Sequence, residues 1–317
     1  MSVQLVSPRS FDDYAAIARL HAFAAGPVSA EELHSADATV VPPDIRRRIV
    51  ALDSSQAIVG SGFAKRLVAL PGTFSVSVSV EPESRRRGIG AALYQDCEAF
   101  AAGQGATSLL TSFPDSDPAA EAFARRCGFE LDQHWVYFAL DLASFDAARF
   151  AAIPAMVEAR GIRFLSLAEA GVTPENQRKL YELNRRTSLD APGEDSFPSF
   201  EEFVDDICGA PWFRADAQII AADGDEWVGL AAVGLEGALA HNAFTGVDRP
   251  YRRRQIAQAL TLRAIEYARS HGAERIQVFN DSRNVAMLAM QETLGYRPIP
   301  GRLVMIKHLA QVAGLPR

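Results

Sequence analysis

The sequence predicts an α+β fold made of two similar domains in tandem, each a mixed, mostly antiparallel sheet flanked by helices. Three observations support this fold class. The chain has 317 residues, which accommodates about two domains. The predicted elements in each half follow the order strand, two helices, three strands, helix, strand, helix and strand, which does not match a doubly wound sheet. The two halves also share an internal repeat.

The repeat becomes visible when the sequence is shifted by 167 residues, which brings Gly88 onto Gln255. The same shift brings Arg85-Arg86-Arg87 onto Arg252-Arg253-Arg254 and Gly128-Phe129 onto Gly295-Tyr296. One register without an insertion through a helix, a strand and a second helix indicates an internal duplication. We therefore expect an N-terminal domain over residues 1–150 and a C-terminal domain over residues 151–317, joined by a helical connector.

In the first half, alternating apolar residues predict strands, and apolar residues at helical spacing predict helices. Ser10 and Ser29 are candidate N-caps, because acidic residues follow each of them in the first turn. The predicted elements are a strand at 3–6, helices at 11–23 and from 29, strands at 47–52, 57–70 and 73–80, a helix at 89–100, a strand at 108–113, a helix at 118–127 and a closing pair of strands within 129–142.

The second half repeats this order after the connector. Proline and glycine residues between 187 and 198 predict a loop after its first helix. The predicted elements are a strand at 162–167, helices at 174–186 and from 199, strands at 217–222, 226–235 and 239–247, a helix opened by the repeated arginines, a strand at 275–280, a helix at 284–294 and a last strand at 303–308.

Composition excludes several classes of function. The chain has 48% hydrophobic residues, 22% charged residues and a net charge of −7, which argues against a nucleic-acid partner. We expect no membrane partner, because no apolar run approaches the ~20 residues of a spanning helix. Three separated cysteines suit a reduced, cytoplasmic protein. The six histidines form no metal-binding pair, so no metal is expected.

A basic, glycine-containing loop is the strongest chemical signal. The alternating run 73–80 is followed by Arg85-Arg86-Arg87-Gly88-Ile89-Gly90, which opens a predicted helix. The first N–H groups of a helix lack intrahelical partners and attract anions, and glycines let the backbone approach a phosphate. A glycine pair at such a turn is equally common as a packing feature, and its recurrence in the repeat favours a phosphate site.

The spaced residues Val80-x-Pro82-x-x-Arg85-x-x-Gly88-x-Gly90, with Gly128-Phe129 after the next helix, resemble the GCN5-related N-acetyltransferase (GNAT) family. The resemblance implies the acyl-CoA N-acyltransferase fold and binding of the pyrophosphate of acetyl-CoA by the loop. The residues that it implies for cofactor binding are Val80, Arg85, Arg86, Arg87, Gly88, Ile89 and Gly90 in the first copy, and Thr245, Val247, Arg252, Arg253, Arg254, Gln255, Ile256, Ala257 and Asn284 in the second.

The resemblance further implies transfer of an acetyl group from acetyl-CoA, or another acyl group from its acyl-CoA, to a primary amine of a small molecule or peptide. A β-bulge near Val78 or Thr245 would open the sheet for the cofactor. Both copies lack the tyrosine that protonates the departing thiolate in the family, having Ala124 and Gln291 at that position. A non-catalytic acyl-CoA-binding protein is therefore the alternative. We expect a monomer or a weak homodimer.

The two copies depart from the family pattern in different places. Asp117 stands where the family often has an asparagine that contacts coenzyme A, whereas the second copy has Asn284. The second copy has Gln255 in place of the first loop glycine, which costs about 1–2 kcal/mol if the position requires positive φ. We expect the C-terminal copy to be catalytic. The general base cannot be assigned from the sequence, because acidic side chains are usually solvated at the surface. The acidic residues compatible by position are Glu81, Glu236, Asp281 and Glu292.

Overall fold

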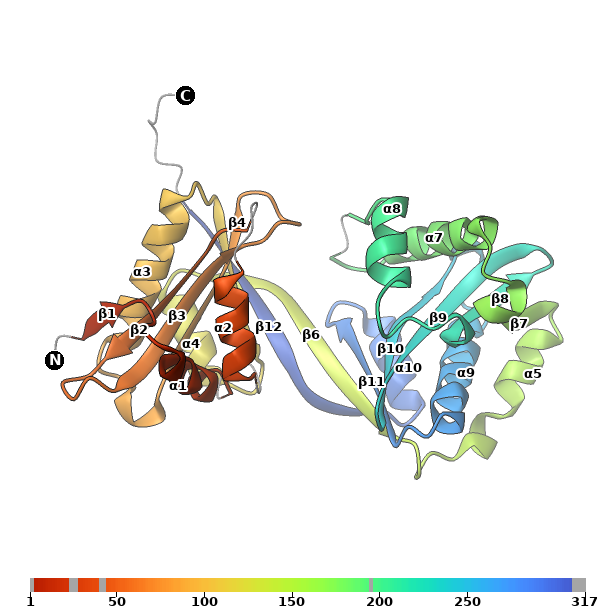
Figure 1. The fold of residues 1–317 in the computed structure, drawn as a ribbon. Helices are drawn as coiled ribbons and strands as arrows, with labels where there is room; N and C mark the ends of the chain where they lie inside the picture. Colours follow the sequence, from red (N-terminus) through yellow and green to blue (C-terminus); the bar gives the residue numbers. More distant parts are fainter. Residues whose placement is uncertain (1–2, 23–27, 40–43, 194–195, 310–317) are drawn as a thin grey trace. The chain divides into compact units, whose positions relative to one another are not determined.

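The computed structural model describes residues 3–22, 28–39, 44–193 and 196–309. The chain forms two compact units (Figure 1). Unit 1 consists of Met1–His134 and Gly301–Arg317, and unit 2 consists of Trp135–Pro300. Each unit is an α+β domain with helices on both faces of one mixed sheet, as predicted.

The sheet of unit 1 has the strand order β1-β2-β3-β4-β5-β12. Neighbouring strands are antiparallel except for the parallel pair β4 and β5. Ser29 caps α2 in a capping box with Glu32, as its position before an acidic turn predicts. The strands β1 to β5 are Gln4–Val6, Arg46–Leu52, Ile58–Arg66, Thr73–Val80 and Ser108–Pro114, and the helices α1 to α4 are Phe11–Ala22, Ala30–Ala38, Ile89–Gly103 and Pro118–Arg126.

Unit 2 has the equivalent order β6-β11-β10-β9-β8-β7, with β10 and β11 as the parallel pair. Its strands are β6 (Glu130–Asp141, of which residues 135–141 belong to unit 2), β7 (Ile162–Ser166), β8 (Gln218–Asp223), β9 (Glu226–Glu236), β10 (Leu239–Val247) and β11 (Arg275–Asp281). Its helices are α5 (Ala152–Glu158), α6 (Leu167–Ala170), α7 (Pro174–Ser188), α8 (Phe200–Glu202), α9 (Ile256–Ser270) and α10 (Val285–Thr293).

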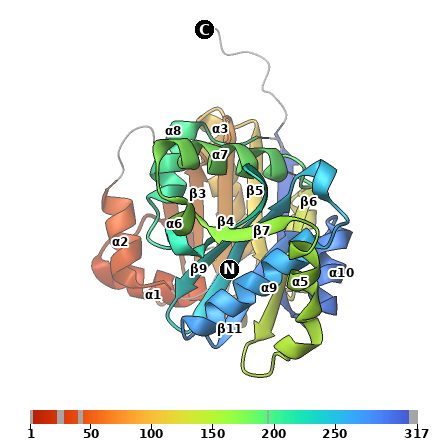
Figure 2. The ribbon, with the colours of Figure 1, turned by 90° about the vertical axis from the view of Figure 1, so that its right-hand side faces the viewer.

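Each sheet buries both of its faces. In unit 2, α9 packs against one face beside the connector helix α5 (Figure 2), and α7 packs against the other face. Leu260 of α9 is fully buried in the first core, and Leu183 of α7 is fully buried in the second. In unit 1, α3 and α1 take the corresponding places, with Leu93 and Leu20 in the two cores. Among the described residues, no helix is long and apolar enough to cross a membrane.

The last strands differ from the sequence-based expectation. The stretch expected as a closing strand pair within 129–142 is one strand, β6, which pairs along Trp135–Asp141 with β11 of unit 2. The last strand, β12 (Arg297–His308), pairs along Arg302–His308 with β5 of unit 1. The compact units therefore do not divide the chain at residue 150. Each half of the chain supplies the final strand of the other unit's sheet, because duplicated halves offer equivalent pairing edges.

Candidate functional site

The backbone of the two basic loops has the geometry of an anion nest. Arg86 and Gly88 have φ values of 65° and 84°, and Arg253 and Gln255 have values of 60° and 64°. Left-handed residues at alternate positions turn successive N–H groups toward one point, where an anion can accept them. Each loop leads directly into a 15-residue helix, α3 or α9. Both loops therefore have the backbone shape that a pyrophosphate requires.

The predicted loop residues differ in what their side chains offer. The side chains of Ile89 and Ile256 are in the hydrophobic cores, so these residues have only backbone groups to offer a ligand. Arg85 donates its Nε–H to the carbonyl oxygen of Val80 at 3.0 Å, and Arg252 donates its Nε–H to that of Val247 at 3.0 Å. The first arginine of each loop thus closes its own strand-to-helix turn.

Gln255 occupies a position that favours glycine, so its replacement tests the loop geometry. We expect Gln255→Gly to stabilise unit 2 by roughly 0.5–1 kcal/mol, because relief of the left-handed strain exceeds the entropic cost of glycine. Gly88→Gln should destabilise unit 1 by about 1 kcal/mol, since a Cβ there meets nothing within 4 Å and the cost is purely conformational. Chemical denaturation measures the free energy of unfolding of both variants. Destabilisation by Gln255→Gly, or stabilisation by Gly88→Gln, would contradict the loop geometry.

The parallel strands separate next to each loop. Within the described residues, β4 pairs with β5 only along Thr73–Ser75, and β10 pairs with β11 only along Leu239–His241. In unit 2 the separation coincides with a β-bulge, where the register between β10 and β9 shifts between Asn242 and Phe244. The expected bulge near Thr245 is therefore present. The expected alternative near Val78 is wrong, because β4 pairs with β3 in one unbroken register.

The bulged strand directs free donors toward the gap. Asp248 donates its N–H to Val228 of β9 at 2.9 Å, and the register from Thr245 to Val247 is regular. Because N–H directions alternate along a strand, the N–H groups of Thr245 and Val247 point away from β9, toward the side from which β11 has departed. Asn242 and Thr245 hydrogen-bond through their side chains at 3.0 Å, which braces the bulge.

A pocket of about 270 Å³ lies at this place in unit 2. It is lined by Val247 at the end of β10, by the loop and first turn of α9 (residues 251–253 and 255–258), and by Met290 of α10. Six of the predicted cofactor-binding residues line it, namely Val247, Arg252, Arg253, Gln255, Ile256 and Ala257. Thr245, Arg254 and Asn284 are not among its lining residues.

A phenylalanine occupies the equivalent position in unit 1. Phe123 stands 167 residues before Met290, and an ideal Cβ on Gly90 would lie 3.5 Å from the Phe123 ring and 3.7 Å from Val80. The ring therefore rests against the loop glycine and the end of β4. A methionine at this place adapts to a ligand more readily than a packed phenylalanine, because its side chain is unbranched and flexible.

The helix after the next strand also differs between the units. Asp117 accepts hydrogen bonds from the N–H groups of Ala119 and Ala120, so its carboxylate caps α4. Asn284 is the N-cap residue of α10, and its side chain makes no capping hydrogen bond. The tyrosine position holds Ala124 in unit 1 and Gln291 in unit 2, and neither side chain has an acidic proton. Both are buried, with exposed fractions of 4% and 1%.

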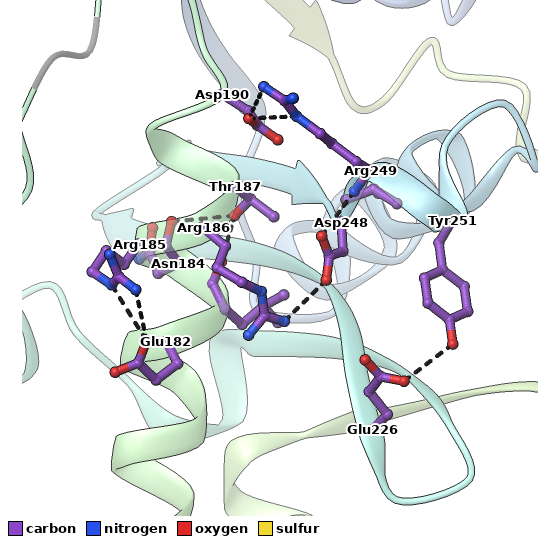
Figure 3. A network of polar contacts seen from close by, with 12 residues as sticks. Glu182, Asn184, Arg185, Arg186, Thr187, Asp190, Glu226, Asp248, Arg249 and Tyr251 are labelled. Carbon is purple, nitrogen blue, oxygen red and sulfur yellow. Dashed lines mark hydrogen bonds and ion pairs between the residues drawn. The ribbon is translucent and has the colours of Figure 1, made fainter.

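Two equivalent ion pairs link α1 of unit 1 and α7 of unit 2 each to the phosphate loop of its own unit. Arg19 of α1 contacts Glu81 at 2.9 Å, and Arg186 of α7 contacts Asp248 at 3.1 Å (Figure 3). The shift of 167 residues relates Arg19 to Arg186 and Glu81 to Asp248, so the repeat extends to α1 and α7. Sequence reasoning missed these pairs, although the same shift would have matched the residues.

Asp190, in the predicted loop after α7, makes a further contact in unit 2 (Figure 3). Its carboxylate accepts hydrogen bonds from Arg249 Nε at 2.7 Å and from Arg252 Nη2 at 2.5 Å. The hydrogen bond from Arg249 and the charge of Arg252 hold the pKa of Asp190 below its ordinary value. The stabilisation from this carboxylate is therefore complete above the unfolded-state pKa of about 3.9, and it is lost as the pH falls through the lower folded-state pKa.

Removing the Asp190 charge should strengthen anion binding at the neighbouring loop. We expect Asp190→Asn to raise the affinity for acetyl-CoA about three- to tenfold at pH 7.5 and low salt, because a carboxylate no longer competes for Arg252. Glu182→Gln is the matched control, since Glu182 lies on α7 and pairs with Arg185 at 3.2 Å. Calorimetric titration measures both variants. Weaker binding by Asp190→Asn would instead assign Asp190 to positioning Arg252.

The four candidate bases are placed differently. Glu81 is paired with Arg19, and Asp281 is paired with Arg283 at 2.6 Å with its side chain 3% exposed. Glu236 and Glu292 are exposed. None of the four lines the pocket at the loop of unit 2. Within the described part of the chain, no group of three acidic, histidine or cysteine side chains could hold a metal ion.

Comparisons with known proteins match both halves of the chain. The family model "Acetyltransferase (GNAT) family" matches residues 21–129 and 178–296. The mycothiol acetyltransferase of Clavibacter michiganensis is 24% identical over 228 residues, which cover 71% of this chain and 70% of that protein. The mycothiol acetyltransferase of Acidothermus cellulolyticus is 26% identical over 239 residues, covering 70% of this chain and 68% of that protein.

Solved structures share the fold along almost the whole chain. A GCN5-related N-acetyltransferase from Sphaerobacter thermophilus has a TM-score of 0.72 at 19% identity, covering 96% of this chain and 95% of that one. A tandem GNAT protein from the clavulanic acid biosynthesis pathway has a TM-score of 0.66 at 20% identity, covering 97% and 98%. The tandem arrangement expected from the repeat is confirmed.

Proposed function

The chain belongs to the GNAT acetyltransferase family and is an N-acetyltransferase, and on this premise we propose that unit 2 transfers an acetyl group from acetyl-CoA to a primary amine. Unit 1 serves as a scaffold with a retained phosphate loop. The family uses acyl-CoA donors and amine acceptors. Three free cysteines, none of them in a disulfide, support a reducing, cytoplasmic setting.

The observation that carries the assignment to unit 2 is the β-bulge at Ala243, where β10 leaves β11. The bulge interrupts β10 of unit 2, whereas β4, the equivalent strand of unit 1, pairs with β3 in an unbroken register. It lies beside the pocket that the phosphate loop lines, and Met290 rather than a phenylalanine borders that pocket. Five of the six expected cofactor-binding residues in the second loop line this pocket, namely Arg252, Arg253, Gln255, Ile256 and Ala257, which supports the proposal.

The residues of unit 2 support direct transfer. The loop N–H groups would hold the pyrophosphate, and the N–H of Thr245 would polarise the thioester carbonyl. The ammonium form of the acceptor first loses one proton to solvent. The amine nitrogen then forms a bond to the carbonyl carbon as the carbon–sulfur bond breaks, the nitrogen releases a second proton to solvent, and the thiolate leaves as the anion. A free thiol has a pKa near 8.5, so the thiolate can leave as the anion without the missing tyrosine, at a cost of up to about 10²–10⁴-fold in rate, the usual contribution of a general acid.

Amine-dependent release of coenzyme A tests this function. We expect thiol release from acetyl-CoA only when a primary amine is present, with an acetylated amine detected by mass spectrometry. The rate should rise with pH as more of the amine loses its proton. Binding of acetyl-CoA without release by any amine in a broad panel would instead support the non-catalytic alternative.

A further inference from the structure

Three aromatic side chains form a cluster on one face of the sheet of unit 2. Tyr137 of β6 lies directly opposite Phe279 of β11, and their ring centroids are 5.5 Å apart. Trp135, two residues before Tyr137, is diagonal to Phe279 with a centroid distance of 5.6 Å and an edge-to-face angle of 82°. We call Trp135, Tyr137 and Phe279 the aromatic platform.

The platform is on the face of the sheet away from α9. Phe138 and Val278, which alternate with platform residues along β6 and β11, belong to the core that α9 closes. On the platform side, the core beneath α7 is built on strands β8 to β10, from residues such as Ile220 and Leu230. Phe279 is left 48% exposed. Trp135 and Tyr137 are half-buried, so the three rings form one continuous, partly exposed apolar patch. Contiguous exposed apolar surface is a feature of ligand-binding and interaction sites.

The platform borders the place where the acyl group would arrive. The last paired residues of β10 and β11 are His241 and Gln277. Phe279 lies two residues further along β11, on the same face as Gln277, beside the gap that the bulge opens. An acceptor resting on the platform would therefore lie next to the free donors of β10.

Unit 1 provides an internal control. Ser112 stands 167 residues before Phe279, and it pairs with Val304 as Phe279 pairs with Tyr137. Arg302 pairs with Pro114 as Trp135 pairs with Asp281. None of these unit 1 residues is aromatic. The duplicated sheets thus differ at this patch, and the unit that has the bulge also has the platform.

Charges at the edge of the platform limit the kind of acceptor. Asp281, opposite Trp135, accepts hydrogen bonds from Arg283 Nε at 2.8 Å and Nη2 at 2.6 Å. The Asp281 side chain is 3% exposed, whereas that of Arg283 is 54% exposed. The edge therefore presents a guanidinium to solvent, and the carboxylate is already engaged. The engaged carboxylate offers little attraction to the second ammonium group of a linear diamine, which leaves ring stacking as the main attraction.

Resting on the proposed function of unit 2, we propose that the aromatic platform binds the ring of an acceptor whose primary amine is joined to that ring by a short linker. The ring stacks on Phe279 and Tyr137, and the amine reaches toward the N–H of Thr245. Aromatic pairs of this kind select a ring over an aliphatic chain of similar length.

Calorimetry without acetyl-CoA tests the platform independently of catalysis. The probes are 2-phenylethylamine and 1,4-diaminobutane. We expect wild type to bind the first at least ten times more tightly, and Phe279→Ala to weaken its binding about five- to tenfold. Phe11→Ala in unit 1 is the matched control, because Phe11 is 45% exposed, and it should change nothing. Equal affinities, preference for the diamine, no binding of either probe, or an equal loss in Phe11→Ala would overturn the proposal.

Steady-state kinetics separate this proposal from the proposed function. Phe279→Ala should raise KM for 2-phenylethylamine about five- to tenfold and leave KM for 1,4-diaminobutane unchanged. If no amine releases coenzyme A but 2-phenylethylamine still binds through Phe279, the proposed function fails and the platform stands. If transfer occurs with KM values that Phe279→Ala does not alter, the platform proposal fails and the function stands.

Discussion

Ala257→Glu is expected to weaken acetyl-CoA binding at least 100-fold while the protein remains folded. Ala257 is the second residue of α9 and lines the pocket at the phosphate loop. A carboxylate about 5 Å from a phosphate charge repels it by roughly 3 kcal/mol at an effective dielectric constant of 20. The same carboxylate stabilises the helix itself, because it lies near the positive end of the helix dipole.

The duplicated chain supplies the control for this prediction. Gly90 is the second residue of α3, and a Cβ there makes only ordinary contacts with Phe123 and Val80. Gly90→Glu should leave acetyl transfer unchanged, and the neutral variant Ala257→Gln separates charge from volume. Calorimetry and the thiol-release assay measure all three. If Gly90→Glu abolishes activity and Ala257→Glu does not, the working site is in unit 1.

Met305→Ala is expected to destabilise unit 1, although residue 305 is in the second half of the sequence. Met305 of β12 is fully buried in the core beneath α3. Leu140 of β6 is 5% exposed in the core beneath α9, so Leu140→Ala should destabilise unit 2. Each change removes buried methylene groups and leaves a cavity, which typically costs about 2–5 kcal/mol.

Hydrogen exchange resolved by peptide measures this crossed pattern. Met305→Ala should lower the protection of α3 more than that of α9, and Leu140→Ala should do the reverse. Phe150→Ala, in the connector and in the core of unit 2, should behave like Leu140→Ala. A loss of protection confined to α9 in Met305→Ala would mean that each half of the chain folds on its own strands.

Local patterns predicted the elements well because their signals are local. Ser29 followed by Glu32 predicted the start of α2, and the alternation over 73–80 predicted β4. The strand exchange had no such signal. The alternating residues of β6 and β12 fit an edge in either unit, because both edges descend from one sequence and pairing partners are set by long-range packing.

Residues that line the candidate pocket could be named from the sequence where the motif is continuous. Arg252, Arg253, Gln255, Ile256 and Ala257 line one pocket because they belong to one loop and the first turn of its helix. The contact of Asp190 with Arg249 joins residues 59 positions apart, and the residues around Asp190 predicted only a loop. The platform joins β6 to β11, so no inspection of either strand alone would bring Tyr137 next to Phe279.

Because the strands are exchanged, the chain cannot be divided between its two repeats into fragments that each fold alone. A fragment that stops at residue 150 carries β6 without its partner β11, and it lacks the β12 segment that covers the edge of β5. The complementary fragment from residue 151 has the reciprocal defect. Each fragment would expose an unpaired sheet edge and an open core, a combination that promotes aggregation. Co-expression of the two fragments would restore both sheets. The covalent connection between the repeats therefore raises the effective concentration of each half for the other and does not determine the fold of either unit.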